Sequence, residues 1–266
     1  MPRLKFRRSY FAAPYLLLNV LFIIVPLVFL LVMAFTGEDG GFTFANFASF
    51  FTGANALRVM GRSFLIAFLT TAGCLLVGYP VALILSNSKI NTSAVLVLLF
   101  VLPMWINSLL RTYAIKSVFD AVNMQNEYAK VTIAMIYDFF PFMLLPLYTA
   151  MVNLDKSLTE AASDLGAGAF TVFLRVRLPL SVPGIISGVL MVFMPTVSTF
   201  AISEIVSGKP ETYLFGNLIN DFFGKNEGLY GLGSAYAFIL LMLICLTLFA
   251  ANKLAKGGEL GRGGLL

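Results

Sequence analysis

Six long runs of apolar residues, separated by shorter polar segments, make up most of the chain. Each run has about 20 residues or more, the length that an α-helix needs to cross roughly 30 Å of hydrocarbon. The apolar residues follow one another without alternation, which favours helices over the strands of a membrane barrel. The pattern predicts an all-α membrane protein whose transmembrane helices span residues 11–35, 64–86, 94–116, 131–152, 184–206 and 231–252.

Composition agrees with a membrane protein. Mean hydropathy is +0.90 and 12% of the 266 residues are charged, whereas soluble domains carry about 25% charged residues. The chain contains no histidine, and Cys74 and Cys245 lie in two different apolar runs. We therefore expect both cysteines to be small buried hydrophobic residues, and we predict neither a metal site nor a catalytic site. A membrane-embedded enzyme would have few residues to work with.

The first apolar run follows the basic segment Arg3–Arg8, as the apolar part of a signal peptide would. The run is about 25 residues long, and no cleavage site of small residues follows it before Gly37. We therefore expect it to be retained as the first transmembrane helix.

Lysine and arginine are unevenly distributed between the two ends of the predicted helices. If residues 1–10 are cytoplasmic, the inner side holds eleven of the 18 basic residues and four of the 13 acidic ones. The positive-inside rule then places both termini in the cytoplasm, with a membrane domain at 11–252, a cytoplasmic loop at 153–182 and a cytoplasmic Gly-rich tail at 253–266. Membrane lipid accounts for this basic excess and the net charge of +5, so we predict no nucleic-acid partner.

The loop at 153–182 is too polar to span a membrane and too helix-prone to be a simple tether. Thr159 is a candidate N-cap for a helix that opens with Glu160, and Gly166 and Gly168 allow a break after it. A second short helix is predicted at Ala169–Arg177, ended by Pro179 and Pro183. From these residues alone, the loop either docks a partner protein in water or lies on the lipid surface.

A family resemblance favours the first alternative. Glu160, Ala161 and Ala162, with Gly166 six residues after the glutamate and Leu178-Pro179 further on, resemble the EAA motif of permease subunits in prokaryotic ABC importers. The resemblance implies the type I ABC importer permease fold and a coupling loop that docks a cytoplasmic ATPase. The residues expected to dock it are Glu160, Ala161, Ala162, Asp164, Gly166, Leu178 and Pro179.

The chain has no GxxxxGK(S/T) phosphate-binding loop. We therefore expect it to bind no cofactor and not to be an enzyme, with ATP and Mg²⁺ used by the partner ATPase.

Further blocks resemble the polyamine branch of that family, the B-type permeases of spermidine/putrescine importers. These blocks are Gly78–Pro80, Leu102–Tyr113, Pro141–Tyr148 and Glu160–Gly166. The resemblance implies a multi-pass protein of the prokaryotic inner membrane that translocates spermidine or putrescine. Its implied partners are two copies of a cytoplasmic ABC ATPase, a second homologous permease and an extracytoplasmic polyamine-binding protein.

Candidate substrate-pathway residues are polar or aromatic side chains within the apolar runs. Asp138 lies about seven residues into the fourth run, hence roughly 10 Å from its outer end, and an ionisable group at such a depth marks either function or a salt bridge between helices. Glu204 lies at the outer end of the fifth run, after Phe200. It is either a functional group or an ordinary charge at the headgroup level.

The third run carries a polar stripe. Asn107 and Arg111 are four residues apart and are expected to share a helix face. Trp105, predicted to lie mid-span, and Tyr113, near the outer end, are either membrane-interface anchors or cation–π walls for an amine. Arg111 would repel a polyamine unless a carboxylate such as Asp138 neutralises it. The complete set of pathway candidates is Trp105, Asn107, Tyr113, Asp138, Phe200 and Glu204.

Two other functions stay open at this point. One is an ABC permease for another small solute, such as a betaine, ferric ion or an oxyanion. The other is a channel or carrier that needs no ATPase. Such a carrier would work alone in liposomes, whereas a permease requires its partner chains.

Overall fold

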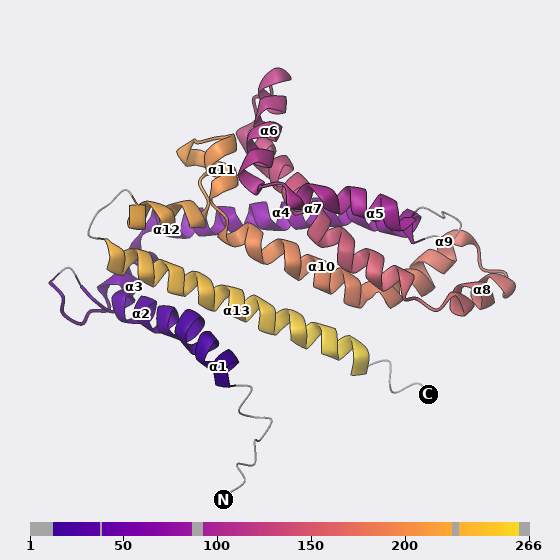
Figure 1. The fold of residues 1–266 in the computed structure, drawn as a ribbon, viewed down its shortest axis with the longest axis horizontal. Helices are drawn as coiled ribbons and strands as arrows, with labels where there is room; N and C mark the ends of the chain where they lie inside the picture. Colours follow the sequence, from indigo (N-terminus) through magenta and orange to yellow (C-terminus); the bar gives the residue numbers. More distant parts are fainter. Residues whose placement is uncertain (1–12, 38, 87–92, 225–228, 261–266) are drawn as a thin grey trace, which may run out of the picture. The chain divides into compact units, whose positions relative to one another are not determined.

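The structure, a computed structural model, describes residues 13–37, 39–86, 93–224 and 229–260. Among these residues, five helices are long and apolar enough to cross a membrane: Pro14–Ala34, Ala54–Leu85, Glu127–Val152, Ala169–Ser198 and Tyr230–Ala251. A bent pair, Val95–Trp105 with Ser108–Ala121, makes a sixth crossing if it is counted as one span. The prediction of an all-helical membrane protein is confirmed, with five or six spans (Figure 1).

The chain forms two compact units. The first consists of Met1–Leu57 and Leu218–Met242, and the second of Arg58–Asn217 and Leu243–Leu266. The last helix, α13 (Tyr230–Leu260), begins in the first unit and continues into the second. Because α13 reaches Leu260, residues 253–260 of the predicted Gly-rich tail are helical, and residues 261–266 lie outside the described part.

The first unit contains the first predicted span. It is a helix in three parts, α1 (Ala13–Asn19), a π-helical turn (Val20–Ile24) and α2 (Val25–Ala34), and most of its described side chains are exposed, as lipid-facing residues are. The loop after it is held by Asn46, whose Nδ2 donates hydrogen bonds to the carbonyls of Ala34 and Thr36, each 3.0 Å long. Asn46 belongs to α3 (Ala45–Thr52).

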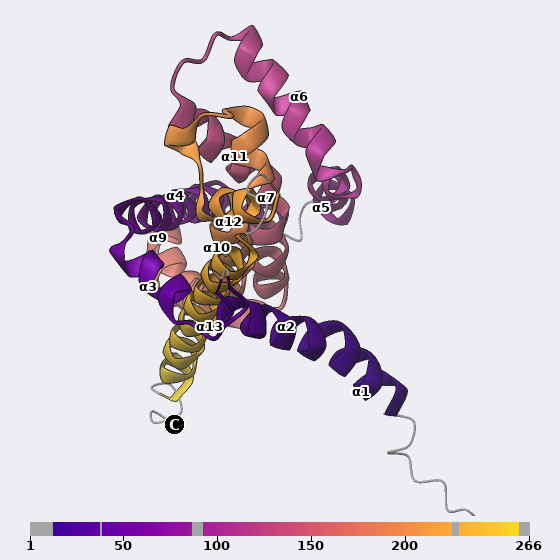
Figure 2. The same cartoon turned by 90° about the vertical axis from the view of Figure 1, so that its left-hand side faces the viewer.

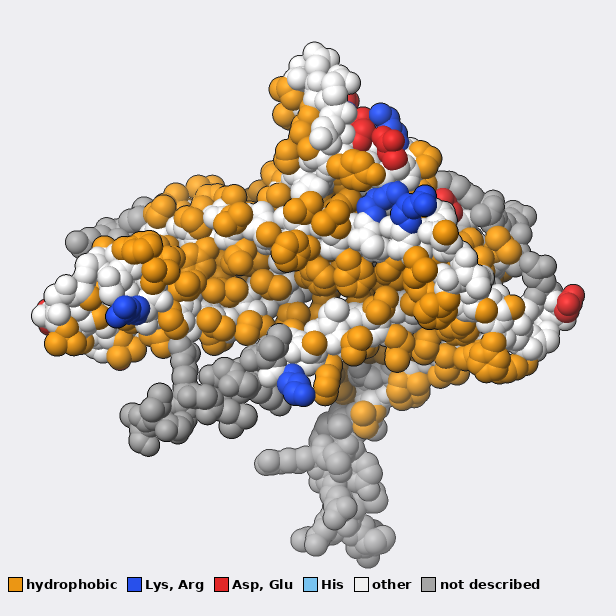
Figure 3. Space-filling view, turned by 180° about the vertical axis from the view of Figure 1, so that it is seen from behind, with side chains coloured by type: hydrophobic (Ala, Val, Ile, Leu, Met, Phe, Trp, Pro, Cys, Tyr) orange, Lys and Arg blue, Asp and Glu red, His pale blue; other side chains and the backbone are white. Residues whose placement is uncertain are grey.

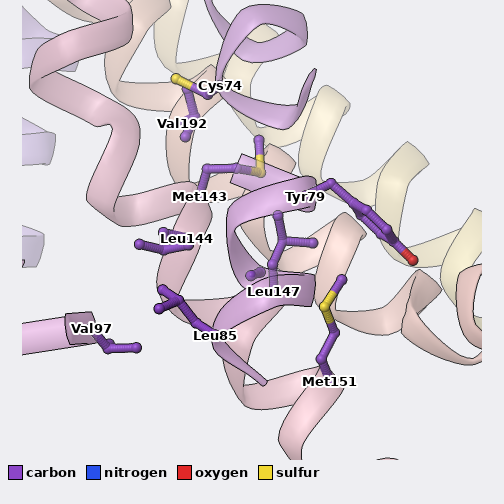
Figure 4. Packing of buried hydrophobic residues seen from close by; sticks show 10 residues of the cluster. Cys74, Tyr79, Leu85, Val97, Met143, Leu144, Leu147, Met151 and Val192 are labelled. Carbon is purple, nitrogen blue, oxygen red and sulfur yellow. The ribbon is translucent and has the colours of Figure 1, made fainter. Parts of the chain in front are cut away.

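The second unit contains a large hydrophobic cluster. Its side chains come from α4 (Ala54–Leu85), α5 (Ser93–Val101), α7 (Glu127–Val152) and α10 (Leu178–Ser198), and Figure 4 shows them meeting between these helices. The buried members are Cys74, Tyr79, Ala82, Leu85, Val97, Met143, Leu144, Leu147, Met151 and Val192. Cys74 is buried as predicted, whereas Cys245, on α13, is exposed because its helix presents that side to the surroundings.

Two glycines let α10 approach α7 closely. A Cβ atom on Gly184 would lie 2.9 Å from the carbonyl oxygen of Pro146, and one on Gly188 would lie 3.3 Å from the carbonyl oxygen of Met143. The glycines are four residues apart and therefore share one face of α10. This spacing of small residues is typical of closely crossing helices in membranes, where packing replaces the hydrophobic effect as the driving force.

The third predicted span, 94–116, is wrong as a straight helix. α5 is followed by a 3₁₀ turn (Leu102–Trp105), and α6 (Ser108–Ala121) leaves at 98° to it. Figure 2 shows α6 turned away from α5. The change of direction has a local cause, because Pro103 lacks a backbone N–H and Asn107 caps a new helix by accepting a 2.9 Å hydrogen bond from the N–H of Leu109.

The fourth and fifth predicted spans have different bounds in the structure. α7 begins at Glu127, not 131, because Asn126 caps it there. The fifth helix runs from Ala169 to Ser198, not from 184 to 206. Thr199 is extended after Pro195 in the last turn, and α11 (Ala201–Val206) is a separate short helix.

Many large hydrophobic side chains of the described residues are exposed. On the face shown in Figure 3 they predominate, and the charged side chains form a few small groups. Exposed apolar side chains occur on every long helix, as expected where the surroundings are lipid instead of water.

Substitution of Gly184 by valine tests the close helix crossing. The added Cβ meets backbone of α7, which cannot yield as a flexible side chain would, so we expect the protein to lose about 1–3 kcal/mol of stability. Thermal unfolding of the detergent-solubilised protein should show a lowered midpoint. Gly61→Ala on α4, where no atom lies within 4 Å of the new Cβ, is the control and should not lower the midpoint. Equal midpoints for both variants would contradict the crossing.

Candidate functional site

The loop between α7 and α10 begins with a short exposed helix, α8 (Lys156–Asp164). Asp155 caps it, because its carboxylate accepts a 2.9 Å hydrogen bond from the N–H of Ser157. That bond holds the pKa of the Asp155 carboxyl below its ordinary value. The predicted cap, Thr159, is wrong: it lies inside the helix, where its hydroxyl donates to the carbonyl of Lys156.

Gly166 ends α8 with a Schellman motif. Its φ is +84°, its N–H donates to the carbonyl of Ser163 at 2.9 Å, and the N–H of Ala167 donates to the carbonyl of Ala162 at 3.1 Å. These bonds satisfy carbonyls that the end of a helix would otherwise leave free. The predicted break at Gly166 is therefore confirmed, and its cause is the left-handed conformation that glycine adopts without strain.

The second part of the loop differs from the prediction. α9 (Ala169–Val172) continues through a π-helical turn (Phe173–Arg177) directly into α10. Pro179 and Pro183 therefore do not end a helix. Leu178 and Pro179 lie where the π-helical turn passes into α10, inside a helix that runs on from Ala169. Figure 1 shows α8 and α9 together at one end of the second unit.

α8 and α9 expose both carboxylates and large apolar side chains. Glu160, Ala161 and Asp164 are exposed on α8. Leu165 is 90% exposed and Phe170 is 73% exposed, close in sequence to these carboxylates. Sequence reasoning overlooked these two apolar residues, although large apolar residues in a polar loop are a signal of a docking surface.

A cleft of about 780 Å³ opens beside α8. It lies between α8, the helix Ala169–Arg177 and the adjoining ends of α4 and α7. Its lining residues are Leu83, Ser86, Met151, Leu154, Asp155, Lys156, Thr159, Glu160, Ser163, Asp164, Ala169, Phe170, Val172, Phe173 and Arg177. Nearby, the Tyr79 and Ser181 hydroxyls lie 2.9 Å apart and link α4 to α10. The loop is thus continuous with α7 and with the helix that leads into α10, and this bond joins α10 to α4.

A second group of candidates is buried where α6, α7 and α11 pack together. Arg111 of α6 and Asp138 of α7 form an ion pair, with Nη2 2.6 Å from Oδ1, and both side chains are more than nine-tenths buried. The anticipated neutralisation of Arg111 by Asp138 is confirmed. Because α7 begins at Glu127, Asp138 is eleven residues from the start of its helix, or about 16 Å along it, and not seven as predicted.

The other pathway candidates lie apart from this ion pair. Trp105 is 84% exposed at the bend before α6, so its predicted place in the middle of a straight span is wrong. Asn107 caps α6 and does not share a helix face with Arg111. Tyr113 is exposed on α6.

Phe200 and Glu204 lie after the end of α10, at the start of α11 and within it, so neither belongs to the fifth span. A buried polar group missed by sequence reasoning holds this segment. Asn217 accepts hydrogen bonds from the Ser203 hydroxyl (2.6 Å) and from the N–H of Leu214 (2.9 Å), and its Nδ2 donates to the carbonyl of Phe200.

The sequence profile of the family described as "Binding-protein-dependent transport system inner membrane component" matches residues 5–256. The chain belongs to this family. It is a multi-pass inner-membrane permease of a bacterial ABC transporter, a transmembrane subunit without an ATPase domain. Members of the family typically bind no cofactor, and ABC transporters of this kind work with an ATPase and a periplasmic binding protein.

Relatives are similar to the permease over most of its length. It is 34% identical to the spermidine/putrescine transport system permease protein PotB of Haemophilus influenzae over 261 residues, which cover 88% of this chain and 90% of that protein. It is 30% identical to PotB of Escherichia coli over 260 residues, with 88% and 94% covered. Its fold matches a chain of a bacterial alginate ABC transporter with a TM-score of 0.74 at 16% identity, covering 93% of this chain and 94% of that one.

Gly166→Ala tests how α8 is closed. Alanine at φ +84° is strained by about 1 kcal/mol, and local unfolding of α8 should become about fivefold more frequent. Hydrogen exchange of residues 156–165 in the purified permease measures this change. Gly168→Ser is the control: the φ of Gly168 is −66° and no atom lies within 4 Å of the new Cβ, so exchange should stay as in the wild type. Unchanged exchange in Gly166→Ala would contradict the Schellman closure.

Proposed function

We propose that the permease is one of two homologous permeases of an ATP-driven importer that carries polyamines, such as spermidine and putrescine, into the cytoplasm. The observation that carries the proposal is the similarity, over 88% of the chain, to relatives named as spermidine/putrescine permeases. The two permeases would line one pathway, with two ATPase copies beneath them and an extracytoplasmic polyamine-binding protein above.

The proposed docking surface for the ATPase is α8 with the residues around it. Supporting it are the exposed Glu160, Ala161 and Asp164 and the neighbouring apolar Leu165 and Phe170. Apolar side chains of this size are costly in water and are better covered by a partner. In this proposal Gly166 closes the docked helix, and Leu178 and Pro179 begin the helix that carries its movement into the membrane.

The proposed orientation places both termini and α8 in the cytoplasm. It rests on the excess of lysine and arginine on the inner flanks of the spans. The ATPase, which would use ATP and Mg²⁺, then lies on the same side as α8. When the ATPase closes around ATP, it would move α8, and with it α10, so that the pathway between the two permeases opens to the outside. Hydrolysis would restore the cargo-free state, and α8 supplies the differential contact that any such switch requires.

The proposed substrate pathway includes Asp138, the deepest candidate carboxylate, which supports a cationic cargo. Trp105 and Tyr113 offer exposed aromatic faces for ammonium groups. Asn107, Phe200 and Glu204 complete the proposed set, since they lie at the two places where helices are interrupted.

Uptake into proteoliposomes tests the function directly. The permease is reconstituted with its partner permease and ATPase, supplied with binding protein, and offered labelled spermidine or labelled glycine betaine. We expect spermidine uptake that requires both ATP and the binding protein, because the pathway holds a carboxylate and not a surplus of basic groups. Uptake of betaine alone would contradict the polyamine cargo. Uptake by this chain without the ATPase would contradict the whole proposal and indicate a carrier.

A further inference from the structure

The buried ion pair between α6 and α7 is incompletely satisfied. Arg111 contacts Asp138 through Nη2, at 2.6 Å from Oδ1, and the contact does not have the geometry of a hydrogen bond. Arg111 Nε and Nη1 are also buried and have no hydrogen-bond partner among the described residues. An arginine that pairs well with a carboxylate uses two parallel N–H donors. Arg111 and Asp138 carry the opposite charges of such an interaction but do not form its two parallel hydrogen bonds.

Such a pair is a poor device for holding two helices together. Removing two charges from water costs more than their attraction returns unless hydrogen bonds satisfy the remaining donors and acceptors. A well-packed apolar pair of similar size often serves stability as well or better. Ionisable groups at this depth in a membrane protein therefore point to the pathway of a substrate or ion.

The surroundings of the pair agree with such a role. α6 begins at the bend after Trp105, and α11 begins just after α10 ends at Ser198. Both α6 and α11 pack against α7, the helix that carries Asp138. Irregular backbone at membrane depth is tolerated where protein covers it or where it lines a watery cavity, and transporters form substrate sites from such interrupted helices. The Arg111–Asp138 pair lies where two interrupted helices meet a continuous one.

We propose that Arg111 holds the place of the cargo: its guanidinium pairs with the Asp138 carboxylate while the pathway is empty, and an ammonium group of the cargo displaces it from that carboxylate. This inference rests on the proposed polyamine function. A spermidine ammonium is a compact cation with three N–H donors and satisfies one carboxylate readily. When Arg111 leaves, it gives up one ion-pair contact, and its other two buried nitrogens, which have no hydrogen-bond partner among the described residues, have no bond to lose.

The exchange conserves charge at the carboxylate. Asp138 is paired with a cation before the cargo arrives and paired with another afterwards, so it is never a lone charge in a low-dielectric region. α6 bears the displaced guanidinium, and its bend at Asn107 gives it a point from which to move relative to α7. Arg111 therefore acts as a specificity residue, because a neutral or anionic solute cannot replace it at Asp138.

The test compares single and double charge removals in the reconstituted importer, with uptake of labelled spermidine expressed per assembled complex. Asp138→Asn should lower uptake at least about tenfold, since the acceptor for the cargo is lost. The double variant Arg111→Gln/Asp138→Asn should stay at the same low rate. Asp138→Glu, which keeps the carboxylate, should recover most of the uptake. Asp120→Asn, an exposed carboxylate near the end of α6, is the matched control and should transport normally.

A purely structural ion pair gives the opposite pattern. Each lone charge would then damage assembly, and the double variant, which has no lone charge, would regain wild-type uptake; that recovery would overturn the proposal. If Asp138→Asn does not assemble, the double variant decides alone, with low uptake in favour and normal uptake against. Failure of the polyamine function is recognised separately, because the wild-type importer would then take up no spermidine.

Discussion

The close crossing of α7 and α10 is the contact on which the rest of the second unit depends. Gly184 and Gly188 allow backbone to approach backbone next to Pro146 and Met143, and the hydrophobic cluster around Leu147 fills the space beside them. α7 contributes to both candidate sites, and α10 to the first. α8 lies between the end of α7 and the start of the helix that continues into α10, and Asp138 lies on α7, fourteen residues before that end.

This arrangement gives a physical route between the two sites. Tightly packed helices move as rigid elements and not by gradual bending, since close-packed interiors transmit displacement. In the proposed mechanism a displacement of α8 shifts α7 and α10 together and changes how α7 lies against α6. The Arg111–Asp138 pair spans that second boundary, so a movement of α7 against α6 acts on it directly.

Much of this architecture was predictable from the sequence, for reasons that particular residues make clear. Continuous apolar runs identify spans, because lipid leaves the backbone no alternative to a helix. Gly166 identifies the break after α8, since it is a small residue in a polar, helix-prone loop. Asp138 and Arg111 were paired correctly, because two opposite charges in apolar runs need each other.

The errors concern places where hydropathy carries no information. Large apolar residues continue on both sides of the bend after Trp105, so only Pro103 and Asn107 signal it. Prolines such as Pro179 and Pro183 are common near either end of a helix, so their presence does not decide between the two. The π-helical turn at Phe173–Arg177, through which the helix continues to Pro179, has no recognisable sequence pattern. Thr159 and Asp155 are both good caps, and the choice depends on where α7 ends. Whether Asp138 meets cargo depends on partner chains that the sequence of one subunit does not contain.

In the proposed mechanism, everything depends on the binding of α8 to the ATPase subunit in the water beside the membrane. Its most direct test is a photo-activated cross-linker placed at Ala161, an exposed position on α8, in the assembled importer. We predict a cross-linked product between this permease and the ATPase subunit, with a yield that changes when ATP is added. Cross-links to lipid alone, with no second polypeptide in the presence or absence of ATP, would contradict the account.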